Sequence, residues 1–125
     1  MTIQELYATI GGDYDAAIKI MRRDRLVDRT VRRFASSNLC ADLVAATESG
    51  DPTAIFEAAH ALKGVSANLG LTDIYKLTET VTDEFRAGNT RSLSDEEVKA
   101  KVAQIDEMCQ RTVAAIKDYE AEQDA

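Results

Sequence analysis

The apolar and polar positions of this chain alternate with the period of a helix from one end to the other. Apolar side chains recur three or four residues apart, as with Val27, Val31 and Phe34 in the first half and Val98, Val102 and Ile105 in the second. This spacing places them on one face of an α-helix, with polar residues on the opposite face. The pattern therefore predicts an all-α protein.

Capping residues indicate where the first helices begin and end. Thr2 and Glu5 have the spacing of a capping box, which predicts a short helix to about Ile10, ended by two glycines. A second short helix is expected over 14–21. From Asp24 the helical spacing continues to Ala46 with a polar interruption at 36–38, which predicts either one kinked helix or two helices.

The remaining helices follow the same signals. Gly50, Asp51 and Pro52 suit a helix stop, an N-cap and a first helical position, so a helix is expected over 52–69. The next begins near Thr72 and ends at Gly88. A second capping box at 94–97 starts a long helix to about Tyr119, followed by an acidic tail at 120–125 that we expect to fray.

Four helices of 15 or more residues joined by short connections favour an antiparallel up-and-down four-helix bundle. We expect this bundle to cover about 24–119, with the short N-terminal helices packed at one end. The 125 residues are an ordinary length for one domain, and the chain contains a single proline. We therefore interpret residues 1–125 as one domain.

The longest apolar runs fall far short of a membrane span, and the first residues lack a basic leader, so we expect a cytoplasmic protein with no membrane contact. Cys40 and Cys109 have no CxxC spacing and no neighbouring histidine. This indicates neither a zinc site nor a disulfide framework, and two buried free thiols are expected.

Charge is unevenly distributed along the chain. Residues 19–33 carry a local charge of +5, whereas the whole chain carries −7 and the remainder therefore −12. A basic segment can bind nucleic acid, but this one has no interleaved aromatic residues and belongs to an acidic molecule that would repel a polyanion. We interpret it as a solvated helix face and expect no nucleic-acid partner.

The only histidine of the chain, His60, lies in the helix expected over 52–69. On a helical wheel, the apolar positions fall on the side opposite His60, at Ile55, Ala58, Leu62, Val65 and Leu69. His60 is therefore predicted to face solvent. Its neighbours on that face are Phe56, Lys63, Gly64 and Ala67.

Two of these neighbours break local rules. Gly64 in mid-helix costs about 0.5–1 kcal/mol relative to alanine, and Phe56 is a large apolar residue on a polar face. Such violations are typical of functional positions. Gly64 and Ala67 would let a partner approach the ring closely, and Lys63 could neutralise charge that arrives on it.

His60 has no catalytic partners of its own. The face lacks further metal ligands, a serine–acid pair and a glycine-rich phosphate loop, so no metal or nucleotide site is predicted. An exposed imidazole is largely unprotonated near neutral pH and can attack an electrophilic phosphorus. The chemistry would then depend on a partner.

The segment from Ala59 to Gly70, AHALKGVSANLG, closely resembles the motif A-H-x-L-K-G-x-x-x-x-L-G of histidine-containing phosphotransfer (HPt) domains. Gly50-Asp51, Arg33-Phe34 and the stretch from Leu77 to Gly88 are similar to the usual framework of that family. The resemblance covers roughly residues 5–120. It departs from many relatives at Ala61, where threonine is common.

The resemblance implies a four-helix bundle that exchanges a phosphoryl group with the aspartate of response-regulator receiver domains. His60 would be the phospho-acceptor, Lys63 the cation that stabilises the phosphoryl oxygens, and Gly64 the gap that admits the receiver; Phe56 and Ala67 are added from the wheel as docking surface. The family implies no cofactor of its own, since the receiver supplies Mg²⁺, and no autonomous kinase activity.

The expected partners are a receiver domain and a sensor or hybrid histidine kinase, with the chain itself a monomer. Two alternatives stay open. The chain could be an HPt-like adaptor that docks a receiver or kinase without accepting phosphate. It could also be a structural bundle whose basic segment contacts an anionic partner.

Overall fold

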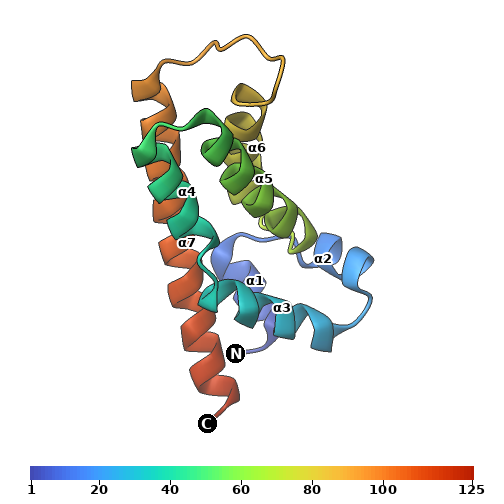
Figure 1. Ribbon diagram of the computed structural model, residues 1–125. Helices are drawn as coiled ribbons and strands as arrows, with labels where there is room; N and C mark the ends of the chain where they lie inside the picture. The colour runs from blue at the N-terminus through green and yellow to red at the C-terminus, as the bar shows by residue number, and fades with distance from the viewer.

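The computed structural model describes residues 1–125 and contains seven helices and no strands (Figure 1). They are α1 (Ile3–Ile10), α2 (Tyr14–Met21), α3 (Asp24–Ser36), α4 (Leu39–Ser49), α5 (Pro52–Asn68), α6 (Thr72–Glu84) and α7 (Asp95–Gln123). Both predicted capping boxes form, at Thr2 and at Ser94. The prediction of an all-α protein is confirmed.

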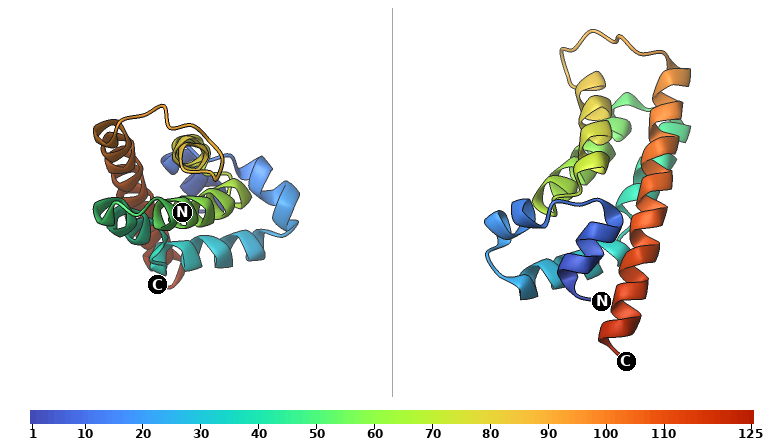
Figure 2. Two further views of the ribbon diagram at one scale, coloured as in Figure 1. Left: turned by 45° about the horizontal axis from the view of Figure 1, so that its top comes forward. Right: turned by 180° about the vertical axis from the view of Figure 1, so that it is seen from behind.

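Helices α4 to α7 form the antiparallel up-and-down bundle, and α1, α2 and α3 pack at its lower end in Figure 1. The view from behind shows α7 running the full length of the molecule, past the bundle and the N-terminal helices alike (Figure 2). With 29 residues, α7 is long enough to contact both layers of the molecule, the bundle of α4 to α6 and the N-terminal helices α1 to α3. The predicted fold class is confirmed.

The predicted helix lengths were wrong for part of the bundle. We expected four helices of 15 or more residues, but α4 has 11 and α6 has 13. The helical pattern from Asp24 divides into two helices, because Ser37 adopts an extended conformation and its hydroxyl donates to the carbonyl of Phe34. The bundle therefore begins at Leu39 rather than near Asp24, and α3 crosses its end.

One apolar core of 22 buried side chains joins the two layers. At their junction the Tyr7 hydroxyl donates to the Leu69 carbonyl at 2.7 Å, and the amide of Asp13 donates to the Gly70 carbonyl at 2.8 Å. A Cβ on Gly70 would lie 2.2 Å from the Asp13 carbonyl oxygen, so only glycine permits this approach. The start of α2 is thereby held against the end of α5. No helix is both long and apolar enough to cross a membrane.

The expected fraying of the C-terminal tail is not found. Helix α7 continues to Gln123, where the Asp124 carboxylate pairs with Arg32 of α3 at 3.0 Å. The N-terminal ammonium pairs with Glu122 at 2.9 Å, so both chain termini lie side by side (Figure 1). These two ion pairs hold acidic side chains of a segment that the sequence alone led us to expect as a frayed tail.

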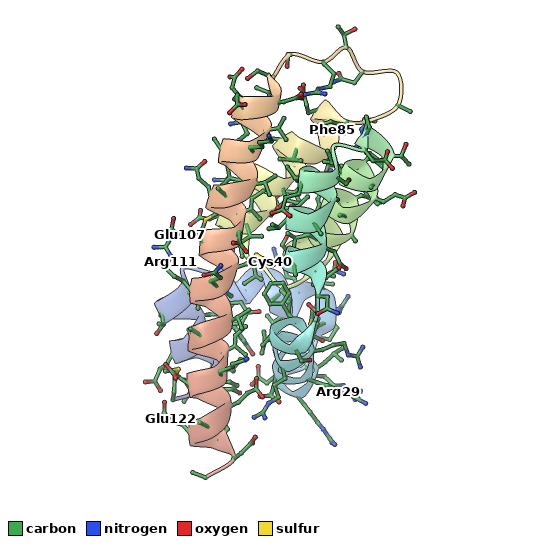
Figure 3. The ribbon with its side chains drawn as sticks, turned by 60° about the vertical axis from the view of Figure 1, so that its left-hand side comes forward. Arg29, Cys40, Phe85, Glu107, Arg111 and Glu122 are labelled. Atoms are coloured by element: carbon green, nitrogen blue, oxygen red, sulfur yellow. A yellow bond between two sulfur atoms is a disulfide. The ribbon has the colours of Figure 1, made fainter.

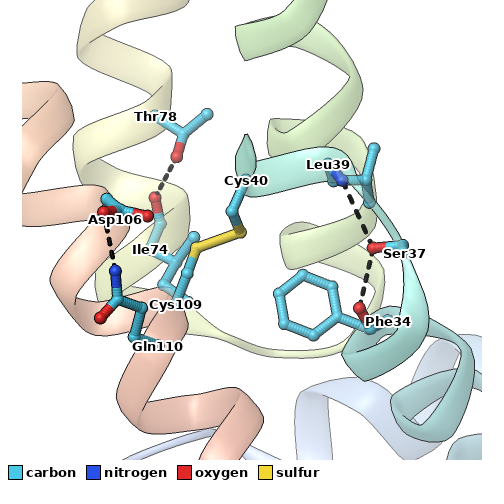
Figure 4. The surroundings of a disulfide bond; sticks show 9 residues. All are labelled: Phe34, Ser37, Leu39, Cys40, Ile74, Thr78, Asp106, Cys109 and Gln110. Carbon is cyan, nitrogen blue, oxygen red and sulfur yellow. Dashed lines mark hydrogen bonds between the residues drawn. A yellow bond between two sulfur atoms is a disulfide. The ribbon is translucent and has the colours of Figure 1, made fainter. Parts of the chain in front are cut away.

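The expectation of two free thiols was also wrong. Cys40, near the start of α4, and Cys109, midway along α7, form a disulfide with their Cα atoms 6.6 Å apart (Figure 4). The two cysteines are 69 positions apart in the sequence, so no local motif indicates that they pair. Only the packing of α4 on α7 brings them together.

Candidate functional site

Helix α5 carries the candidate site, and its first turn is fixed by two local features. The Asp51 carboxylate accepts the amide of Thr53 at 3.0 Å, and Pro52 occupies the first turn, where its missing N–H is not needed. The buried face of the helix consists of Ile55, Ala59, Leu62 and Ser66. It is turned slightly from the predicted stripe, in which Ala58 and Val65 stood; both are half-buried.

His60 is exposed on the opposite face of α5, as predicted. Its ring stacks on that of Phe56, one turn earlier, with the ring centroids 5.6 Å apart and the planes inclined by only 8°. The Phe56 ring also contacts the Arg86 guanidinium, which lies 5.6 Å from the centroid of the Phe56 ring. Arg86 is in turn held by Asp83 at 3.1 Å. The imidazole is therefore exposed, but its contact with Phe56 restricts its orientation.

Lys63 has an acidic partner that the helical wheel alone could not show. Its side chain is only 22 % exposed, and its Nζ lies 3.8 Å from a carboxylate oxygen of Glu79 on α6. The same oxygen accepts the hydroxyl of Tyr75 at 2.8 Å, and this hydrogen bond raises the pKa of Tyr75. Helix α6 thus supplies an anion that holds the Lys63 side chain against the bundle.

Gly64 and Ala67 leave the face beside His60 open. Both residues are exposed, and a Cβ built on Gly64 would meet nothing within 4 Å. No contact inside the chain therefore requires a glycine at this position. The space that Gly64 leaves is available to another molecule.

The structure brings all five predicted site residues onto one side of α5, namely Phe56, His60, Lys63, Gly64 and Ala67. Nearby it gathers no group of three His, Cys, Asp or Glu side chains that could hold a metal ion. Neither of the two principal hollows of the surface is lined by His60. The imidazole is exposed and lines neither of these hollows, which suits transfer between two proteins better than capture of a small molecule.

Sequence reasoning did not include the contribution of α6. Tyr75, Glu79 and Arg86 all reach the neighbourhood of the site from α6 or the turn that follows it. Tyr75, Glu79 and Asp83 recur four residues apart, which places them on one helix face beside the buried stripe. That spacing was visible in the sequence, but the alignment of α6 against α5 was not.

The comparisons with known proteins agree with the motif around His60. The family model of the Hpt domain matches residues 35–115. The chain belongs to the Hpt domain family. No curated protein and no solved structure matches the chain. The matched range covers α4, α5 and α6 entirely and most of α7, whereas α1, α2 and nearly all of α3 precede it.

Membership places the chain in phosphorelay signalling. Hpt domains transfer phosphoryl groups in phosphorelays and interact with receiver domains and histidine kinases. In this Hpt domain, the family range contains the exposed histidine and the helix face around it.

Proposed function

We propose that this Hpt domain accepts a phosphoryl group on His60 and passes it to or from the aspartate of a response-regulator receiver domain. The observation that carries the proposal is the exposure of the only imidazole of the chain within the motif that resembles the family pattern. An exposed nucleophile beside an open helix face can meet an acyl phosphate carried by another protein.

The reaction is an in-line displacement. The unprotonated ring nitrogen of His60 attacks the phosphorus of the receiver's aspartyl phosphate, forming an N–P bond. The P–O bond to the aspartate breaks, and the carboxylate leaves with the electron pair. The reverse reaction regenerates the acyl phosphate. The chain contributes positioning and charge stabilisation, and the receiver contributes the acidic pocket and its Mg²⁺.

Phe56 and Arg86 support the orientation of the nucleophile. The near-parallel contact of Phe56 restricts rotation of the imidazole, and Arg86 bears on that phenyl ring. A ring that is held before the partner arrives loses less conformational entropy when the transition state forms. Phe56 is therefore proposed both as docking surface and as a positioning residue.

Lys63 is proposed to stabilise the phosphoryl oxygens. Its contact with Glu79 is 3.8 Å, longer than a direct hydrogen bond, and leaves ammonium protons available to a phosphoryl group. Glu79 would restrain the lysine in the resting protein. Gly64 and Ala67 would form the flat area on which the receiver docks through a small, transient interface.

The test is transfer of label from a phosphorylated receiver. The chain is incubated with a receiver carrying ³²P on its aspartate, and acid-labile, alkali-stable label is measured on the chain. Wild type should become labelled. His60→Gln should carry none, and because it removes the only histidine, label has no second imidazole to occupy.

Receiver binding by the wild-type chain, measured beside labelling, distinguishes the proposal from the adaptor alternative. Glu57→Gln, an exposed change one turn before His60 and on the same helix, is the matched control and should be labelled like wild type. Label that persists in His60→Gln would contradict the proposal. If wild type binds the phosphorylated receiver but takes no label, the chain is a phosphorylation-incompetent adaptor.

A further inference from the structure

A second exposed surface lies at the turn between α2 and α3, in the part of the chain that precedes the family match. This turn projects sideways past the end of α5 in two views of the molecule (Figures 1 and 2). We use the name basic corner for seven of its exposed residues, Lys19, Ile20, Arg22, Arg23, Arg25, Leu26 and Arg29; the exposed Asp24 lies among them, so these exposed residues together carry a net charge of +4. It occupies a different part of the surface from the face around His60.

The cations of the basic corner have no acidic partner in the molecule. None of its five lysine and arginine side chains takes part in an ion pair. Elsewhere Arg32, Arg86 and Arg91 each pair with a carboxylate within 3.3 Å, and the six other unpaired cations are spread over α3, α6 and α7. Figure 3 shows the side chain of Arg29 pointing away from the bundle. In a chain of net charge −7, five unpaired cations are concentrated at one projection.

The same corner exposes the only two large apolar side chains that the molecule leaves in solvent. Ile20 is 55 % exposed and Leu26 is 42 % exposed, and they flank the turn on either side. Every other large aliphatic residue is buried or half-buried. Exposed apolar side chains close in sequence to several arginines are the residue types that anchor protein interfaces.

The scaffold beneath the corner is rigid. Ala17, Val27 and Val31 are fully buried directly below it. The amide of Arg22 closes α2 by donating to the Ile18 carbonyl at 2.8 Å, with Arg22 in the left-handed region at φ 74°. The arginines are thus presented on helices that pack against the core.

We infer that the basic corner is a docking site for an acidic segment of a partner protein that carries aliphatic side chains. Carboxylates of the partner would pair with the arginines, whose planar guanidinium groups accept a carboxylate in bidentate fashion. Its aliphatic side chains would cover Ile20 and Leu26. This inference does not depend on phosphotransfer at His60.

The composition of the corner favours a protein over other anions. Four of its five cations are arginine, the cation that is enriched at protein interfaces, whereas lysine is depleted there. It contains no aromatic residue on which a base could stack or that could anchor at a bilayer interface. A phosphate backbone offers no apolar groups that could pack against Ile20 and Leu26.

The experiment measures binding of a fluorescein-labelled peptide of repeated Glu-Glu-Leu-Asp units to the full chain by fluorescence anisotropy. A second peptide, with each leucine replaced by serine, tests the aliphatic contribution. Arg25→Glu/Arg29→Glu removes charge from the corner at two exposed positions without ion pairs. Lys99→Glu/Lys117→Glu on α7 makes the same change of net charge at two other exposed, unpaired positions and serves as the control.

The expected result is binding that weakens about tenfold in Arg25→Glu/Arg29→Glu and in Ile20→Ser/Leu26→Ser, but not in the control. The serine peptide should bind more weakly than the leucine peptide. Equal affinity of the corner variant and the control, or no binding of the peptide, overturns the inference. Binding to phosphatidylglycerol vesicles or to duplex DNA in preference to the peptide also overturns it, in favour of a membrane or a nucleic acid.

Discussion

Breaking the Cys40–Cys109 bond should lower the free energy of unfolding by several kcal/mol. The bond closes a loop of 69 residues and joins α4 to α7. In the chain-entropy model, a cross-link over a loop of this length restricts the unfolded chain by about 4 kcal/mol at 25 °C. For a chain of 125 residues, this corresponds to a fall of about 15 °C in Tm.

The assay is urea denaturation followed by helical circular dichroism, with and without dithiothreitol. Five forms are compared: oxidised wild type, reduced wild type, Cys40→Ala, Cys109→Ala and the double variant. Because either substitution removes the whole bond, the two variants should each lose about as much as reduction does, and the double variant little more. The oxidised chain should also show a smaller m value, since its unfolded state exposes less surface.

The reasoning is refuted if reduction leaves the free energy of unfolding of wild type unchanged within about 1 kcal/mol. The same conclusion follows if the chain, unfolded without reductant, releases two reactive thiols. Additive losses in the two single variants would point to packing of two separate thiols instead of a bond. Neither cysteine belongs to α5 or α6, so label transfer to His60 should persist in every form that stays folded.

Substitutions at three further positions, Gly64, Glu84 and Phe56, test the site and the residues that support it. Gly64→Ala should stabilise the chain by about 0.5–1 kcal/mol in urea denaturation, because the added Cβ meets nothing. The bulkier Gly64→Leu should leave the circular dichroism unchanged but slow label transfer about tenfold or more. Unchanged transfer in Gly64→Leu would show that no partner occupies this space. The amide of Leu93 and other donors around the Glu84 carboxylate lower its pKa to about 2, so its contribution to stability is complete above the ordinary pKa of 4.5 and is lost as the pH falls through about 2. Glu84→Gln should therefore be less stable than the wild type at pH 7, and the two should converge near pH 2; a difference that is constant with pH would contradict this assignment. Phe56→Leu should shift the ring-proton resonances of His60 downfield in NMR spectra, because the stacked phenyl ring no longer shields them, and identical spectra would exclude the stack.

The Glu84 carboxylate also explains how the turn after α6 is held. It is 4 % exposed and accepts the amides of Ser92 and Leu93, with the Arg91 guanidinium at 2.7 Å. Arg91 lies over the ring of Phe85, whose position near the top of the molecule is visible in Figure 3. This network closes the loop between α6 and α7. The adjoining turn carries Arg86, so the carboxylate supports the site indirectly.

Local signals in the sequence were sufficient for most helix ends and for the orientation of His60. Thr2, Asp51 and Ser94 act through hydrogen bonds to residues two or three positions away, so their effect can be derived without knowledge of the fold. The exposure of His60 follows from the period of a single helix. These predictions needed no information about which helices touch.

Apart from the helix lengths, what the sequence did not predict concerns contacts between distant segments. Cys40 meets Cys109, Asp124 meets Arg32, and Lys63 meets Glu79 only because particular helices pack side by side in one alignment. Neither charge nor spacing along the chain determines that alignment. For the same reason, the contact of Lys63 with Glu79 could not be derived from the helical wheel of α5 alone.

The two rule violations that first marked α5 have different explanations in the structure. Phe56 on a polar face is accounted for within the chain, since it stacks between His60 and Arg86 and is only half-exposed. Gly64 is not, because its surroundings would accept a side chain and alanine would be more favourable in the helix. A residue that lowers stability without any contact in the chain that requires it points to a constraint from outside. Gly64, more than Phe56, is therefore the position at which a side chain added in the Gly64→Leu variant tests the proposed contact with a receiver.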